Sequence, residues 1–230
     1  MSPMSNYDDD ANELDDRWQD VRNYEDFCHD GILSSDPDED YFSGECGPRV
    51  LYLLKESYGG FTNIRGQDFS SRSFGHGNFW KMLGMWTCVL DNLVEGDSPD
   101  LSDFYDDHND DGYGLANVAY VNIKKEGGRS FSSWPDIKRY ARKDRDFLNE
   151  QIDLCDPQVI VCCGTYRVYS GIICDGDIPI GSQSEPVYDD ENGRIVIDWH
   201  HPSFRGNSNH DFFNFRSFCE KYSEWFTDLD

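Results

Sequence analysis

Three polar stretches each follow a short apolar run of this sequence, and they hold the side chains best suited to chemistry. Residues 55–61 (Lys-Glu-Ser-Tyr-Gly-Gly-Phe) follow the first run, Asn122 lies near the end of the second, and His201 comes just after the last. Apolar runs without helical spacing indicate buried strands, and ligands in open α/β sheets bind at the carboxyl ends of such strands. We therefore expect an amide, an imidazole and a polar loop to meet there, with Glu56 as a carboxylate able to activate water.

The elements that must position these side chains alternate along the chain. Strands are expected at 49–54, 115–123, 159–163 and 194–198, and helices at 13–30, 78–93, 135–154, 166–173 and 210–226. Strands separated by helices pair in parallel through right-handed crossovers. The predicted fold class is therefore α/β: a three-layer α/β/α sandwich with a central four-stranded parallel sheet.

The 230 residues are enough for one substantial core, and the sequence has no internal repeat. Residues 1–48 are expected to form an acidic N-terminal helix and loop packed on the core, and residues 49–230 the α/β domain. No apolar segment approaches the roughly 18 residues of a membrane span, and the acidic start of the chain is unlike a signal peptide. We therefore expect a cytoplasmic monomer without a membrane partner.

Charge and cysteine content limit the possible partners. The formal net charge is -25, which disfavours nucleic acid because phosphate contacts supply much of the affinity of nucleic-acid-binding proteins. Acidic residues crowd 1–45 and 95–111, however, while basic residues gather in 124–145, so a positive face could exist beneath a negative total. A generally acidic proteome would explain the total equally well. The eight cysteines are scattered without a C-x-x-C pair, so we expect neither a metal nor another cofactor.

The order of these motifs resembles the uracil-DNA glycosylase superfamily, and most closely its single-strand-selective monofunctional branch. There Gly-Met-Asn-Pro-Gly-Pro-Phe resembles the sequence at 55–61, and an Arg-Phe-Trp helix start is similar to the sequence at 78–80. The strand-two asparagine of that branch matches Asn122, and its His-Pro-Ser-x-Arg-x-Asn resembles the sequence at 201–207. The stretch 156–164 is also similar to the strand-three signature of the superfamily. The resemblance covers roughly residues 49–209.

This resemblance implies a DNA glycosylase that acts on uracil or a modified pyrimidine in single- or double-stranded DNA, in repair or in defence against phage. His201 would donate a hydrogen bond to the base oxygen that gathers negative charge, although a turn or cap role is the structural alternative. Asn122 would contact the edge of the flipped base, or it could instead satisfy loop backbone groups. Phe61, with Tyr58 beside it, would stack on the base, or Phe61 could simply pack in its loop.

The resemblance also implies a DNA-binding surface. Phe204 and Arg205 would sit on the loop that enters the duplex and fills the vacated space. Ser203 would hold phosphate, and the basic residues after the second strand would extend that surface: Lys124, Lys125 and Arg129. The alternative for these basic residues is a solvated face that balances the acidic runs.

The chain departs from the family pattern at the position of the group that directs the attacking water. The family has Asp or Asn there, whereas this chain has Ser57, with Lys55 in place of the glycine and Tyr58 in place of the proline. Weak catalysis driven by His201, a different modified base, or loss of catalysis would each explain the change. Two other functions therefore stay open: a catalytically inactive, acidic protein that mimics DNA, and an α/β enzyme acting on nucleosides or nucleotides.

Overall fold

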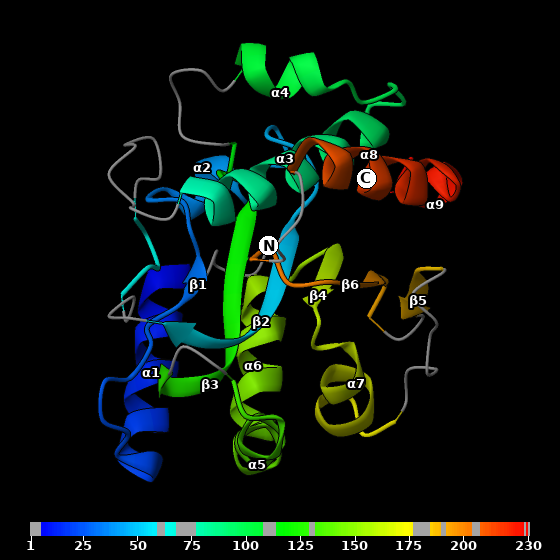
Figure 1. The fold of residues 1–230 in the computed structure, drawn as a ribbon. Helices are drawn as coiled ribbons and strands as arrows, with labels where there is room; N and C mark the ends of the chain where they lie inside the picture. The colour runs from blue at the N-terminus through cyan, green and yellow to red at the C-terminus, as the bar shows by residue number, and fades with distance from the viewer. Residues whose placement is uncertain are drawn as a thin grey trace.

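A computed structural model describes residues 6–58, 63–67, 77–107, 114–128, 132–176, 185–189, 192–203, 208–227 and 229. These residues form one central sheet with helices on both sides (Figure 1). The expected α/β class is confirmed, and the layering is compatible with a three-layer sandwich. Within the described part of the chain, no helix is long and apolar enough to cross a membrane.

The sheet has six described strands in the order β1-β3-β2-β4-β6-β5. Their bounds are β1 Gly31–Ile32, β2 Val50–Tyr58, β3 Val118–Gly128, β4 Val159–Cys163, β5 Val187–Asp189 and β6 Arg194–Trp199. The strands β3, β2, β4 and β6 pair in parallel, and the two edge strands pair antiparallel to them. The four expected strands therefore pair in parallel, but two short edge strands that were not expected make the sheet larger and mixed.

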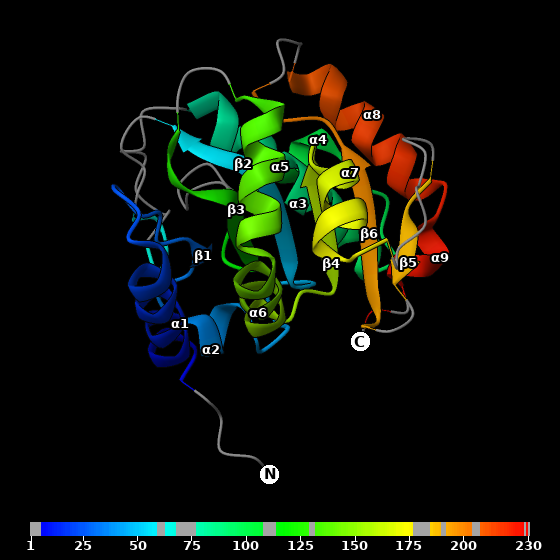
Figure 2. The same ribbon diagram turned by 90° about the horizontal axis from the view of Figure 1, so that it is seen from below.

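The helices divide between the two faces of the sheet (Figures 1 and 2). One face is covered by α3, α4, α8 and α9, and the other by α1, α5, α6, α7 and the π-helical turn that follows α7. The bounds are α1 Tyr7–Arg22, α2 Pro37–Asp40, α3 Gly77–Val94, α4 Leu101–Asp107, α5 Trp134–Lys143, α6 Arg145–Cys155, α7 Tyr166–Val168, the π-helical turn Tyr169–Ile173, α8 Ser208–Glu220 and α9 Ser223–Phe226.

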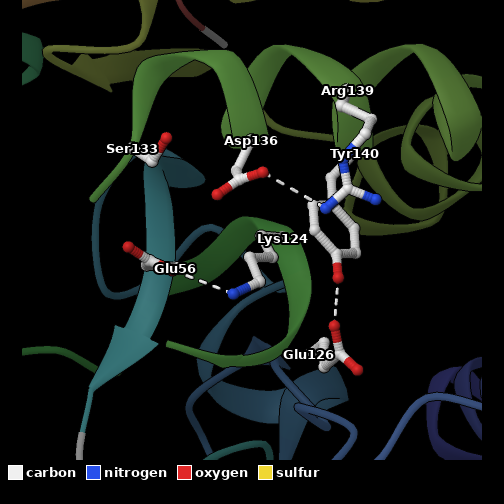
Figure 3. Close-up of a pocket in the computed structure, with 7 residues that line it drawn as sticks. All are labelled: Glu56, Lys124, Glu126, Ser133, Asp136, Arg139 and Tyr140. Carbon is white, nitrogen blue, oxygen red and sulfur yellow. Dashed lines mark hydrogen bonds and ion pairs between the residues drawn. The ribbon is translucent and has the colours of Figure 1, made fainter. Parts of the chain in front are cut away.

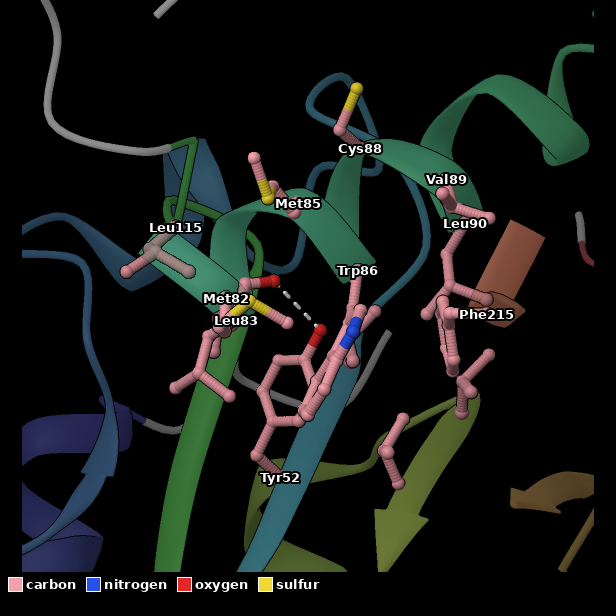
Figure 4. Close-up of a cluster of buried hydrophobic side chains, with 14 of the residues drawn as sticks. Tyr52, Met82, Leu83, Met85, Trp86, Cys88, Val89, Leu90, Leu115 and Phe215 are labelled. Atoms are coloured by element: carbon pink, nitrogen blue, oxygen red, sulfur yellow. Dashed lines mark hydrogen bonds between the residues drawn. The ribbon is translucent and has the colours of Figure 1, made fainter. Parts of the chain in front are cut away.

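The apolar run that begins β2 supplies both halves of the core. Side chains alternate along a strand, so Tyr52 packs towards α3 and α8 while Leu51 and Leu53 pack towards α6 and α7. On the first face, the Tyr52 hydroxyl donates a hydrogen bond to the Leu83 carbonyl over 3.1 Å (Figure 4). Burial of one large apolar side chain contributes about 1.5–3 kcal/mol, so β2 is fixed from both sides and its carboxyl end is held in place.

Several element boundaries differ from those expected. The strand expected at 49–54 is β2, and it continues through the polar residues to Tyr58, because Glu56 still pairs with Lys124 of β3. The helix expected at 135–154 is divided between α5 and α6 at Asp144, whose buried carboxylate accepts hydrogen bonds from Arg22 Nε and the Tyr24 hydroxyl, each over 2.7 Å. The N-terminal region thus contacts the second half of the chain directly.

The N-terminal residues are part of the core as well as of its surface. Helix α1 spans residues 7–22, where 13–30 was expected, and its Trp18 is fully buried and stacked on Phe147 of α6 at 5.1 Å between ring centroids. Strand β1, also from this region, forms one edge of the main sheet. The acidic segment and the rest of the chain therefore share one hydrophobic core.

Candidate functional site

His201 lies just after the carboxyl end of β6. Its Nδ1 accepts a hydrogen bond from the backbone N–H of Ser203 over 3.1 Å. Burial, followed by the nearby charges of Lys55 and His200, lowers the pKa of His201 to about 4. The imidazole is therefore neutral at pH 7, and because Nδ1 is an acceptor, the proton must be on Nε2. The side chain can donate a hydrogen bond through Nε2 without carrying a charge.

His200, the preceding residue, is held by a different set of partners. Its Nε2 lies 2.5 Å from Asp211 Oδ1 on α8, and the other oxygen of Asp211 accepts from Trp86 Nε1 over 3.0 Å. Burial lowers the pKa of His200, but the hydrogen bond and charge of Asp211 outweigh that effect, so the pKa is raised above its ordinary value. His200 Nδ1 lies 3.3 Å from the carbonyl oxygen of His201, so this pair anchors the backbone that carries His201.

Aromatic side chains connect His201 to the first half of β3. The ring of Phe79, in the first turn of α3, lies 5.9 Å from the His201 ring and 6.1 Å from the Tyr120 ring, between centroids. Tyr120 is buried, which raises its pKa, and it interacts with the side chain of Asn122. The structure therefore brings His201 and Asn122 to the same face of the sheet, separated by two aromatic rings.

Asn122 is fully buried, and its amide orientation is set by Asp30. Asp30 Oδ2 accepts from the backbone N–H of Asn122 over 2.8 Å and from its Nδ2 over 3.0 Å. A carboxylate only accepts hydrogen bonds when ionised, so the amide nitrogen must point to Asp30. The Asn122 Oδ1 atom is buried and has no hydrogen-bond partner among the described residues.

Lys55 lies on β2, in the polar stretch that was expected at the site, but the sequence analysis gave it no role there. Its ammonium lies 4.6 Å from the ring centroid of Trp134 and is close enough to His201 to lower the pKa of that imidazole. Burial also lowers the pKa of Lys55 itself. Gly164, after β4, has a φ of 68° and comes near this ammonium, since a Cβ there would lie 3.7 Å from Lys55 Nζ. A cation therefore stands at the carboxyl edge of the central strands.

Two expected catalytic residues have structural partners. Ser57 is buried, with only 3% of its surface exposed, and it hydrogen-bonds Cys28. The neighbouring residue Glu56 has another partner: its Oε2 accepts a hydrogen bond from Lys124 Nζ on β3 over 3.2 Å. These partners do not include His201, and the activation of water by Ser57 or Glu56 stays a prediction.

The expectation that Lys125 lies on a DNA-binding surface was wrong. Lys125 is fully buried, and its ammonium forms an ion pair with Asp30, which is also fully buried. Gln151 Nε2 donates to the same Asp30 carboxylate over 3.0 Å. The Lys125 ammonium is enclosed by Asp30 and by the ring of Trp18, whose centroid lies 5.4 Å from Nζ, and the backbone N–H of Cys28 bonds the Lys125 carbonyl. Lys124 keeps 13% of its side chain exposed, and Ser203 is exposed.

Four of the expected site residues lie outside the residues that the structure describes: Phe61, Arg129, Phe204 and Arg205. The backbone of Tyr58 ends β2, but its side chain is likewise outside the description. Within the described ranges, no group of three or more His, Cys, Asp or Glu side chains is arranged to hold a metal ion.

Sequence reasoning missed Lys55, Phe79, Tyr120 and Asp30 as neighbours of the expected residues. Tyr120 could have been found, because it lies two residues before Asn122 on the same face of a strand. Asp30 gave no such signal, since it lies in another part of the chain.

Comparison of the sequence with models of known protein families and with curated proteins finds no match.

Proposed function

We propose that this protein hydrolyses the N-glycosidic bond of a pyrimidine flipped out of DNA, with uracil or a modified pyrimidine as the leaving base. The observation that carries the proposal is the state of His201: neutral, fixed by Ser203, and with its proton on Nε2. As the glycosidic bond breaks, its electron pair moves into the base and negative charge collects on the base oxygens. A positioned N–H donor stabilises that charge most in a site shielded from water.

Lys55 supports the same step electrostatically. Burial is the main cause of the lowered pKa of His201, and the charge of Lys55 adds to it. A cation near that position favours a departing anion. The sugar cation that remains takes up water at C1′, so the hydroxyl goes to the sugar and the proton to the base. Since Ser57 and Glu56 have other partners, the proposal depends on stabilisation of the leaving base rather than on a strong general base.

The orientation of the Asn122 amide determines which hydrogen-bonding group it would present to a bound base. Both hydrogens of its amide nitrogen face Asp30 and Cys28, so it would present only its carbonyl oxygen to a bound base. That oxygen accepts a hydrogen bond from a ring N–H, as in uracil, or from an exocyclic amine. The proposal extends to the fold, in which the inner strands β3, β2, β4 and β6 would correspond to the sheet of a uracil-DNA glycosylase.

The test is an assay for abasic sites in defined oligonucleotides, both single-stranded and duplex. The panel contains uracil, hydroxymethyluracil, hypoxanthine and phage-type modified pyrimidines, with strand cleavage by alkali as the readout. We expect abasic sites with at least one pyrimidine substrate. His201→Ala should lower the rate by on the order of a hundredfold or more, because the donor to the leaving base is lost.

His210→Ala is the matched control, since His210 is exposed on α8 and should leave the rate unchanged. Absence of abasic sites across the whole panel would overturn the proposal, as would full activity of His201→Ala. Release of bases from free nucleosides without action on DNA would instead identify a nucleoside-processing enzyme.

A further inference from the structure

A pocket of about 310 Å³ lies between the ends of β2 and β3 and the first turns of α5 (Figure 3). Glu56 comes from β2, Lys124 and Glu126 from β3, and Asp136 and Tyr140 from α5. The volume is at the lower end of the range for small-molecule sites. The lining is polar, and it holds three carboxylates and two cationic groups.

The carboxylate of Glu56 lines this pocket and has an incomplete set of hydrogen bonds. Only 7% of the side chain is exposed, and Oε2 is paired with Lys124. Its Oε1 is buried and has no hydrogen-bond partner in the described part of the chain. Gly128 lies close against it, since a Cβ at that position would be 2.7 Å from Glu56 Cγ. Leaving a buried acceptor unpaired costs about 1–3 kcal/mol, so a ligand that donates a hydrogen bond to Oε1 would remove that cost.

Lys124 places a donor beside that acceptor. Its ammonium donates to Glu56 Oε2 and to the Gly127 carbonyl, each over 3.2 Å. An ammonium has three donor hydrogens, so these two bonds leave one. The other ionic groups of the lining already have partners: Arg139 donates to Asp136 over 3.2 Å, and the Tyr140 hydroxyl donates to Glu126. A ligand therefore meets an acceptor and a donor side by side.

The acceptor Glu56 Oε1 and the donor Lys124 Nζ together determine which class of ligand the pocket can bind. An anion would face the carboxylates of Glu56, Glu126 and Asp136, and a cation would face Lys124 and Arg139. A metal ion has no suitable ligand group among the described side chains. A hydroxyl group donates one hydrogen bond and accepts others, so it can donate to Glu56 Oε1 and accept from Lys124 Nζ. We propose that the pocket binds a neutral polyhydroxyl group, namely a sugar.

The sugar pocket, defined by the residues of Figure 3, adjoins the candidate site through β2. Lys55, the residue before Glu56, interacts electrostatically with both Glu56 and His201. Sugar binding by the pocket does not depend on the proposed glycosylase activity. In combination with that activity, the bound group would be a sugar carried by a modified base.

The test is ligand-observed NMR on the full chain with methyl α-D-glucopyranoside and methyl β-D-galactopyranoside, each titrated to 50 mM as order-of-magnitude probes of weak affinity. We expect saturable binding of at least one probe. Glu56→Gln should weaken that binding at least about tenfold, because the ion pair that orients the acceptor is lost. Glu150→Gln is the matched control, since Glu150 is half exposed and pairs with Arg17 elsewhere, and binding should not change.

A second variant tests the location without altering Glu56. Ser133 is exposed at the start of α5 and its side chain makes no capping hydrogen bond, so Ser133→Trp should fold and fill the pocket. Loss of sugar binding in this variant supports the proposal. Failure of both sugars to bind the wild type overturns it, as does binding that survives both Glu56→Gln and Ser133→Trp. Binding of putrescine or inorganic phosphate in place of the sugars also overturns it.

Discussion

Lys124 and Lys125 are neighbours on β3, yet their surroundings differ completely. Lys125 is fully buried and forms an ion pair with the fully buried Asp30, which accepts further hydrogen bonds from Asn122 and Gln151. Lys124 keeps 13% of its side chain exposed and pairs with Glu56, one oxygen of which has no partner among the described residues. Alternation along the strand sends the Lys125 ammonium into the core and the Lys124 ammonium towards the pocket of Figure 3. The two lysines therefore differ in exposure, while each has a neighbour with a buried oxygen that lacks a partner among the described residues: Asn122 Oδ1 near Lys125 and Glu56 Oε1 near Lys124.

The consecutive histidines His200 and His201 are likewise neighbours with different partners. His200 contacts Asp211 and the backbone through its two ring nitrogens, whereas His201 accepts the backbone N–H of Ser203 through Nδ1 and carries its proton on Nε2. In each pair one residue builds the structure and its neighbour is left with capacity to bind. The same residue type in adjacent positions therefore carries no information about function until its partners are known.

Removal of the buried ammonium should have the largest effect on folding. Lys125→Met leaves the charge of Asp30 buried without compensation, which should lower the free energy of unfolding by about 3–5 kcal/mol. Lys124→Met is the matched comparison and should lower it less, by about 1–3 kcal/mol, because Glu56 loses its hydrogen-bond donor but both side chains keep some exposure to solvent. Urea-induced unfolding followed by circular dichroism measures both. Equal losses in the two variants would contradict the contrast between them.

A methyl group beside the side chain of Glu56 should have an intermediate effect on folding. In Gly128→Ala the new Cβ would lie 2.4 Å from the Ser57 carbonyl oxygen and 2.7 Å from Glu56 Cγ. We expect a loss of about 1–3 kcal/mol in unfolding free energy, because strand pairing leaves little room to move. Gly127→Ala is the control: its nearest neighbour would be Asp26 Cβ at 3.5 Å, and the change should stay within about 0.5 kcal/mol. Thermal unfolding compares the two variants.

The smallest effects should come from titration of the two histidines. NMR of the ring nitrogens should show His201 with a pKa of about 4 and its proton on Nε2, and His200 with a pKa above 6.5. The contribution of His201 to stability is complete above pH 6.5 and is lost as the pH falls towards 4. That of His200 is complete below 6.5 and is lost as the pH rises through its raised pKa. Asp211→Asn should lower the pKa of His200 and leave the proton of His201 on Nε2; a proton on Nδ1 in the wild type would remove the basis of the proposed function.

Much of the fold follows from the pattern of apolar residues. The strand at 159–163 was predicted with its observed bounds, because all five residues are apolar and fully buried. The edge strands β1 and β5 were missed because two or three residues are too few to show a period. The polar end of β2 was predicted as a loop, since single-sequence patterns do not reveal that Glu56 pairs with Lys124.

The candidate site was predictable only where its residues follow strands. Asn122 and His201 were expected near each other, and both contact the aromatic group of Phe79 and Tyr120. Lys125 could not be placed from the sequence, because the partner that buries it lies 95 residues earlier in the chain. Whether a lysine is a surface cation or a core residue is decided by such distant contacts, which residue type and local spacing do not encode.

The carboxylate of Asp30 has a further consequence for the sheet. The backbone N–H of Asn122 on β3 donates to this carboxylate. The Asp30 side chain thus takes the place of a neighbouring strand, and this N–H is not left exposed at the sheet edge. The backbone N–H groups of Cys28 and Leu33 bond the β3 carbonyls of Lys125 and Val118 on either side. An exposed strand edge invites association with other chains. Here a two-residue strand and one side chain close that edge, so this flank of the molecule resists β-augmentation and the fibrillar aggregation that it can start.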